Sequence, residues 1–141
     1  MAINTQKVVV GGLAAGVVAN VIGFVLFGLL LGARFEAEAT AVAPALQGRG
    51  MSGSAITTNV LATFVVGLLL VWLYAAIRPR FGPGMKTATY AALVVWVCGF
   101  LFHLDWLTAG LMSAGTYAMA AIAALIQVVA AAGIGGMLYK E

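Results

Sequence analysis

The sequence predicts an all-α integral membrane protein, a four-helix bundle with both termini in the cytoplasm. Two observations predict the fold class. Apolar residues make up 64% of the 141 residues and charged residues only 8%, whereas ordinary globular proteins have about 45–50% and about 25%. The charged side chains are therefore too few to cover the surface of a soluble fold. The chain also contains four apolar runs without Asp, Glu, Lys or Arg, each near the length of about 20 residues that crosses a bilayer.

We expect a single transmembrane domain, residues 1–141, with spans at about 8–32, 55–77, 87–104 and 113–138. The first run is much longer than the apolar region of a signal peptide, which is about 7–15 residues, so we interpret it as a span. Spans two and three are joined by residues 78–86, which hold two prolines and two glycines. This composition predicts a tight connection and therefore antiparallel neighbours.

The loop at 33–54 is the largest predicted segment outside the membrane. Residues 35–42 are rich in alanine and predict a short helix on the membrane surface, which Pro44 limits. Residues 48–54 are rich in Gly and Ser and predict a flexible connector. A loop of this length is too small for a catalytic domain.

The basic residues predict the orientation, because Lys and Arg are enriched in cytoplasmic loops. One side of the membrane receives Lys7, Arg78, Arg80, Lys86 and Lys140, and the other receives only Arg34 and Arg49. This distribution predicts cytoplasmic termini. We expect the lipid headgroup interface to include the basic residues of the second loop and several rings, namely Arg78, Arg80, Lys86, Trp72, Trp106, Tyr74, Tyr90, Tyr117 and Tyr139. Trp96, near mid-span, is expected to pack against a neighbour or to face lipid tails.

Two spans carry small residues on one face, which lets helix backbones approach closely in lipid. The face on the first span is Gly12, Gly16, Ala19, Asn20 and Gly23, and that on the fourth is Ala120, Ala123, Ala124, Gln127 and Ala131. Asn20 and Gln127 fall at a similar depth, about 18 Å from the inner boundary. We expect these two amides to hydrogen-bond to each other, directly or through one water, with a polar site for a substrate or ion as the alternative. The first face can meet another span or a separate protein.

His103 is the one histidine, and it lies at the outer end of the third span beside Asp105. It is a candidate contact for a pigment or haem, although we prefer to interpret it as an interfacial histidine near an Asp that ends the helix. Positions i and i+2 do not share a helix face, and a metal site needs more ligands. No catalytic triad, carboxylate pair, phosphate loop or disulfide framework is present. We therefore expect no enzyme activity, no cofactor and no metal.

Three functions remain after these exclusions. The leading expectation is a non-catalytic accessory or structural subunit of a larger bacterial membrane complex, of respiratory or photosynthetic type, held by small-residue helix packing. Its partners would be the lipid bilayer and other membrane subunits, with no nucleic acid, because the net charge of +3 is spread along the chain. The alternative is a homo-oligomeric channel or small-solute transporter. A pigment- or lipid-contacting scaffold is the third possibility.

Three segments, residues 7–16, 71–84 and 136–141, carry a family resemblance, and the loop at 78–84 is its most specific part. In them the chain resembles a family of small bacterial membrane proteins with four transmembrane helices and no established function. The resemblance implies a multi-pass protein of the bacterial cytoplasmic (inner) membrane. Similar proteins usually carry an acidic residue where Gly23 stands here. This departure removes the one intramembrane carboxylate that would suggest ion coupling.

Overall fold

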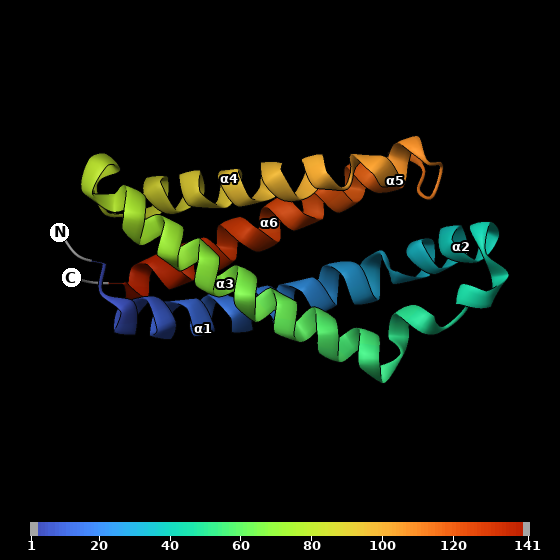
Figure 1. Cartoon of the computed structure of the whole chain (residues 1–141), viewed down its shortest axis with the longest axis horizontal. Helices are drawn as coiled ribbons and strands as arrows, with labels where there is room; N and C mark the ends of the chain where they lie inside the picture. Colours follow the sequence, from blue (N-terminus) through green and yellow to red (C-terminus); the bar gives the residue numbers. More distant parts are fainter. Residues whose placement is uncertain (1–2, 140–141) are drawn as a thin grey trace.

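The computed structural model describes residues 3–139, and these form helices and turns without any strand (Figure 1). Four candidate spans are present in the described chain, at Thr5–Leu30, Gly53–Phe81, Met85–Thr108 and Ala114–Leu138. The all-α fold is thus confirmed, with four helices that are long and apolar enough to span a membrane. The helices are α1 (Thr5–Gly23), η1 (Phe24–Leu30), α2 (Gly32–Val42), η2 (Pro44–Leu46), η3 (Arg49–Met51), α3 (Gly53–Phe81), α4 (Met85–Phe102), α5 (Leu104–Thr108) and α6 (Ala114–Leu138).

The helices run between two ends of an elongated bundle (Figure 1). We call the end with Asn4, the α3–α4 loop and Tyr139 the terminal end, and the end with α2 and α5 the far end. Helix α1 packs against α3 and α6, and α4 packs against α6 and α3. The backbone N–H of Asn4 donates to the Tyr139 hydroxyl at 3.1 Å, which joins the first and last helices at the terminal end.

Three of the spans begin at a residue whose side chain caps the helix. Asn4 accepts from the N–H of Lys7, Ser52 from that of Ala55, and Ser113 from that of Thr116. Such a cap satisfies one of the N–H groups that have no partner inside the helix. Polar residues before each apolar run therefore determine where α1, α3 and α6 start.

The expected loop at 78–86 is wrong at its start, because α3 continues through Pro79 to Phe81. A proline inside a helix removes one backbone hydrogen bond, and here that loss falls in the last turn, next to the helix end. Helix α3 stops at Gly82, whose φ is +82°, and α4 begins after Gly84, whose φ is +119°. The connection is nevertheless tight and joins packed neighbours, as predicted.

The first span and the loop after it also depart from a uniform helix. At Phe24–Leu30 the helix widens into a π-helix, and the N–H of Leu31 donates to the carbonyl of Leu26 at 3.0 Å. The helix predicted at 35–42 is present as α2, which begins earlier, at Gly32, and ends two residues before Pro44. The flexible connector predicted at 48–54 is wrong in part, because η3 lies within it and α3 already starts at Gly53.

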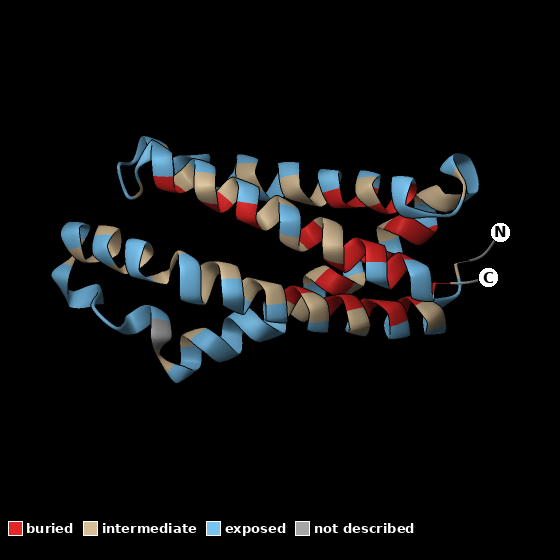
Figure 2. Cartoon of the chain, turned by 180° about the vertical axis from the view of Figure 1, so that it is seen from behind, coloured by how far each residue is buried: buried red, intermediate tan, exposed pale blue. Residues whose placement is uncertain are grey.

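Glycines bring the three central helices into close contact in the half of the bundle nearer the terminal end, where most buried residues lie (Figure 2). A Cβ on Gly67 of α3 would lie 2.6 Å from both the carbonyl oxygen of Gly12 and the backbone nitrogen of Gly16 on α1. A Cβ on Gly11 would lie 2.7 Å from the carbonyl oxygen of Gly135 on α6. Only glycine allows backbones to approach this closely, so α1 is held between α3 and α6.

Candidate functional site

The small-residue face predicted on the first span contacts other helices of the same chain. Gly12, Gly16 and Ala19 are buried, and Cβ atoms on the two glycines would meet Leu68 and Phe64 of α3. Asn20 and Gly23 are half-buried. Sequence reasoning missed the partners on the facing helices, Gly67 and Gly135, because a helix-period pattern does not show which helix lies opposite.

The small-residue face predicted on the fourth span belongs to α6, a helix that contacts both α1 and α4. Ala120, Ala123 and Ala131 are buried, and Ala124 and Gln127 are half-buried. The same helix contacts α1 through Gln127 and α4 through the carbonyl of Ala121, which accepts from the Trp96 indole N–H at 2.8 Å. Trp96 therefore packs against a neighbour, as one of the two expectations had it.

The two amides lie on packed helices but do not bond to each other. Gln127 donates to the carbonyl of Ala19 at 2.8 Å, and Asn20 donates to the carbonyls of Gly16 at 2.9 Å and Val60 at 3.4 Å. The direct Asn20–Gln127 hydrogen bond is therefore wrong, and a contact through one water stays a prediction. Backbone carbonyls compete successfully for the amide donors, because they are within reach on the same and the facing helices.

His103 stands at the break between α4 and α5 and is exposed. Its Nδ1 lies 2.6 Å from the carbonyl oxygen of Gly99, and its ring packs edge-to-face on Trp106 with centroids 5.1 Å apart. A bond to a carbonyl requires the proton on Nδ1, so Nε2 is the nitrogen available to a ligand. Within residues 3–139 no three His, Cys, Asp or Glu side chains gather for a metal. Ligation by His103 stays a prediction.

The rings expected at the interface differ in exposure, and Tyr117 is half-buried with its hydroxyl donating to the carbonyl of Phe100. Trp72, Tyr90 and Trp106 are exposed. Tyr74 and Tyr139 are buried, with 2% and 1% of their surfaces exposed, so the expectation of an interfacial role is wrong for these two. Their rings meet edge-to-face with centroids 6.2 Å apart.

The basic residues of the second loop lie at the terminal end, and their contact with lipid headgroups stays a prediction. Arg80 and Lys86 are exposed, and the Lys86 ammonium lies 5.9 Å from the centroid of the Tyr90 ring. Arg78 is half-buried, and its guanidinium lies 5.8 Å from the centroid of the Tyr139 ring. The three cations thus differ in setting, two at the surface and one against the core.

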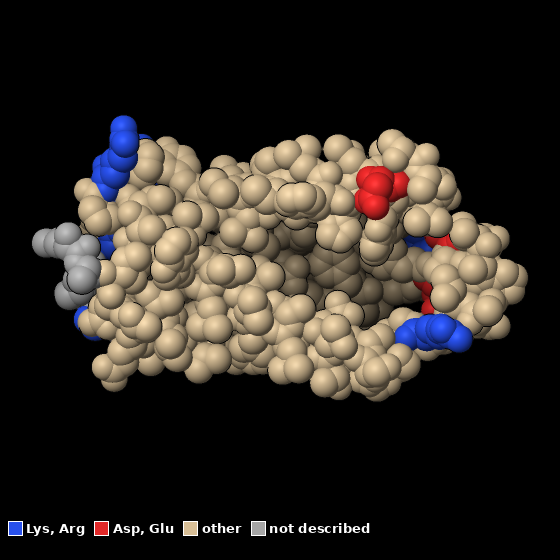
Figure 3. All heavy atoms as spheres, in the orientation of Figure 1, with Lys and Arg blue, Asp and Glu red and all other residues tan. Residues whose placement is uncertain are grey.

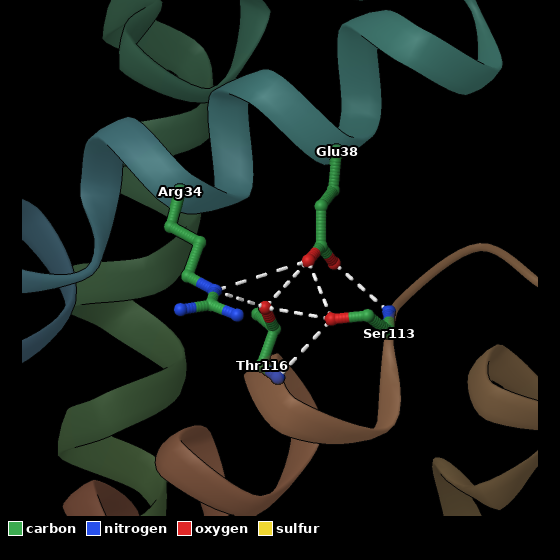
Figure 4. A network of polar contacts seen from close by, with 4 residues as sticks. All are labelled: Arg34, Glu38, Ser113 and Thr116. Atoms are coloured by element: carbon green, nitrogen blue, oxygen red, sulfur yellow. Dashed lines mark hydrogen bonds and ion pairs between the residues drawn. The ribbon is translucent and has the colours of Figure 1, made fainter.

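A polar network that the sequence analysis missed joins α2 to the start of α6 at the far end (Figure 4). Glu38 accepts from the Ser113 hydroxyl at 2.6 Å, the Ser113 N–H at 3.0 Å and the Thr116 hydroxyl at 2.5 Å. Arg34 donates from Nε to Thr116 Oγ1 at 2.6 Å, and its Nε lies 3.9 Å from the Glu38 carboxylate. The only signals in the sequence were the i,i+4 spacing of Arg34 and Glu38 and a serine before an apolar run.

This network stabilises the charged form of Glu38. The hydroxyl groups of Ser113 and Thr116, then the N–H of Ser113 and finally the charge of Arg34 lower the pKa of Glu38 from 4.5 to about 2, while partial burial opposes them. The carboxylate also sits at the N-terminus of a long helix, which favours negative charge. Glu38 therefore remains ionised well below neutral pH and holds α2 on α6.

The far halves of α3 and α4 are separated by a hollow in the molecular surface (Figure 3). Residues 56–62 of α3 are all exposed, and so are residues 101–106, which run from α4 into α5. A packed helix buries at least one stripe, and seven consecutive exposed residues cover nearly two turns. These two segments consequently have no packed face in the isolated chain. We call the hollow between them, with η1 between its walls, the far groove.

No known family model matches the chain, and no curated protein or solved structure matches it.

Proposed function

We propose that the protein is a non-catalytic accessory subunit of a larger bacterial membrane complex, of respiratory or photosynthetic type. The observation that carries the proposal is the far groove, whose two walls lack a packed face. Helices in lipid associate through close packing and interhelical hydrogen bonds. An open groove between two spans offers both to a transmembrane helix of a partner subunit.

The walls of the far groove differ in chemistry, which specifies what kind of helix fits. In the two segments that border the far groove, Thr57, Thr58 and Asn59 are exposed on α3, while Leu101 and Phe102 are exposed on α4. The hydroxyl and amide groups favour small or polar side chains on a partner. The opposite wall favours large apolar ones. We infer that the partner helix has two different faces. One carries small or polar side chains and meets the first turns of α3, and the other carries large apolar side chains and meets α4.

The proposed setting is the bacterial cytoplasmic membrane with the terminal end inside. Lys7, Arg78, Arg80 and Lys86 are at the terminal end, and Arg34 and Arg49 are toward the far end (Figure 3). The positive-inside rule supports this orientation. In this orientation the far groove lies in the outer leaflet. Glu38 and its network are at the far end of the bundle, on the outer side of the membrane.

Site-specific photo-crosslinking in native membranes tests the subunit proposal. Probes at Leu61 and Leu101, which are 61% and 62% exposed, lie on the two walls, and Val10 at 57% exposure is a matched control on the well-packed half. We expect both wall probes to capture the same membrane protein, which should also co-purify stoichiometrically in mild detergent, and the Val10 probe not to capture it.

Two other outcomes contradict the accessory-subunit proposal. Crosslinks between copies of this chain, together with solute flux in proteoliposomes that contain only this chain, would favour the homo-oligomeric channel or small-solute transporter. Adducts with lipid alone at all three positions would mean that acyl chains fill the far groove.

A further inference from the structure

A cavity of about 400 Å³ lies at the terminal end, between the last turns of α3, the first turn of α4 and the last turns of α6. It is separate from the far groove, which lies at the opposite end of the bundle. Its lining is largely apolar and includes Met85, Gly133 and the rings of Tyr74 and Tyr139. One charged residue, Arg78, also lines it.

Hydrogen bonds and close packing fix the walls of this cavity. The Tyr74 hydroxyl accepts from the N–H of Gly84 at 3.1 Å, so the end of α3 is tied to the start of α4. The Tyr139 hydroxyl is held in the same way by Asn4. A Cβ on Gly133 would lie 2.7 Å from the terminal methyl of Met85, so glycine there lets the Met85 side chain pack against α6 as part of the wall. Preformed walls reduce the ordering cost of binding a ligand.

The charge in and around the cavity favours an anion. The guanidinium of Arg78 lies against the Tyr139 ring, and a guanidinium carries its N–H donors in a planar fork that matches the oxygens of a phosphate. Arg80 and Lys86 are exposed at the same end, whereas the described carboxylates belong to α2 and α5 at the far end (Figure 3).

The start of α4 strengthens this preference. Gly84 and Met85 line the cavity, and α4 has no acidic residue in its first turn and no side chain that caps it. The N–H groups at a helix start carry a partial positive charge. The cavity thus combines a guanidinium with the positive end of an 18-residue helix.

We propose that this cavity binds the phosphate-bearing headgroup of an anionic phospholipid from the leaflet at the terminal end. The cavity lies at the ends of three spans, which is the depth of the lipid headgroups in a bilayer. Its apolar walls suit the glycerol ester region that follows the phosphate. Basic pockets between transmembrane helices bind anionic headgroups in this manner. Free phosphate shares the same recognition chemistry, and the experiment separates the two.

Lipid titration of the delipidated full chain in neutral detergent tests the proposal, with the rise in Tm as the readout. The probes are phosphatidylglycerol, phosphatidylcholine and inorganic phosphate. We expect a saturable rise with phosphatidylglycerol and little with the other two. Arg78→Gln should weaken the apparent Kd for phosphatidylglycerol by about ten- to a hundredfold, since hydrogen bonds to charged groups contribute about 1.5–3 kcal/mol.

Arg80→Gln is the matched control, because it removes the same charge two residues along α3 and Arg80 does not line the cavity. It should leave the apparent Kd within about threefold of the wild-type value, because solvent and salt screen an exposed charge. Arg78→Lys keeps the charge and loses the fork, and should still weaken binding if Arg78→Gln fails to fold. Equal effects of Arg78→Gln and Arg80→Gln, or equal responses to both lipids, would overturn the proposal. Saturation by inorganic phosphate at the lipid's concentration would overturn the lipid assignment.

Discussion

Gly67 lies where α3 crosses α1, and the space there admits no side chain. We expect Gly67→Ala to destabilise the fold by about 1–3 kcal/mol, because its methyl group would overlap backbone atoms of Gly12 and Gly16. Gly99→Ala is the control. A Cβ there meets nothing within 4 Å, and alanine should add up to about 1 kcal/mol of helix propensity. Thermal unfolding of both variants in detergent measures the difference, and equal Tm values would contradict the close crossing.

Gly23 and Gln127 should be energetically coupled. A Cβ on Gly23 would lie 2.5 Å from the Gln127 side-chain nitrogen, so alanine must displace the amide from the carbonyl of Ala19. In a Gln127→Ala background, we expect Gly23→Ala to stabilise the fold through helix propensity. In the wild-type background the same substitution should give about 0.5–2 kcal/mol less stabilisation, because it also displaces the Gln127 amide. A double-mutant cycle by thermal unfolding gives this coupling energy. Strict additivity would show that the two residues do not touch.

At the residue scale, the sequence predicted which positions are small but not what they contact. The spacing of Gly12, Gly16 and Ala19 indicated a packing face, and all three are buried. Hydrogen-bond partners were not predictable in the same way. A side-chain amide in lipid bonds to whichever carbonyl is within reach, and the choice depends on the rotation of each helix about its axis, which composition and period do not determine.

The attachment of α2 to α6 is expected to persist in acid, because it depends on the Glu38 carboxylate. The folded-state pKa is about 2, below the ordinary value of 4.5. The stabilisation is therefore complete above about pH 4.5 and is lost as the pH falls through about 2. Hydrogen exchange of the α2 amides as a function of pH should show protection at pH 4 and its loss near pH 2.

Glu38→Gln should abolish this protection at every pH, because the amide carries no charge and cannot accept three donors as a carboxylate does. Glu36→Gln is the matched control on the same helix. Glu36 accepts from the N–H of Gly48 at 2.6 Å and is not part of the network with α6. Loss of α2 protection in the Glu36 variant alone would indicate that the loop, and not α6, holds α2.

At the scale of elements, helix starts were more predictable than helix ends. Polar caps precede α1, α3 and α6, and a cap acts within one turn, so the sequence contains the whole signal. Pro79 misled the prediction, because a proline near a helix end removes a bond in a turn that is about to stop anyway. The π-helix at Phe24–Leu30 had no local signal among its apolar residues.

The orientation of the whole molecule can be measured with single cysteines in a Cys98→Ser background. Gly50→Cys lies toward the far end and Lys86→Cys at the terminal end, and both positions are exposed. If the terminal end is cytoplasmic, a membrane-impermeant maleimide should label intact cells at position 50 and label position 86 only after permeabilisation. The reverse pattern would contradict the positive-inside argument.

At the scale of the molecule, the sequence predicted the number of spans but not the far groove. Each run of apolar residues is long enough to cross a bilayer, and that length is a property of the chain alone. Whether the far halves of two spans stand apart depends on the angle at which their helices cross, and the residues at the crossing determine that angle. An apolar residue that faces a neighbouring helix and one that faces lipid have the same hydropathy, so residues 56–62 gave no sign of their exposure.

The Gly12–Gly67 crossing also makes α3 a lever whose pivot lies at the middle of the helix. The contact is 14 residues from the start of α3 at Gly53, a distance of about 21 Å along the helix. Each 10° of rotation about the crossing therefore moves that start by roughly 4 Å, given a rise of about 1.5 Å per residue. A single methyl group at this pivot would therefore change the width of the far groove between α3 and α4.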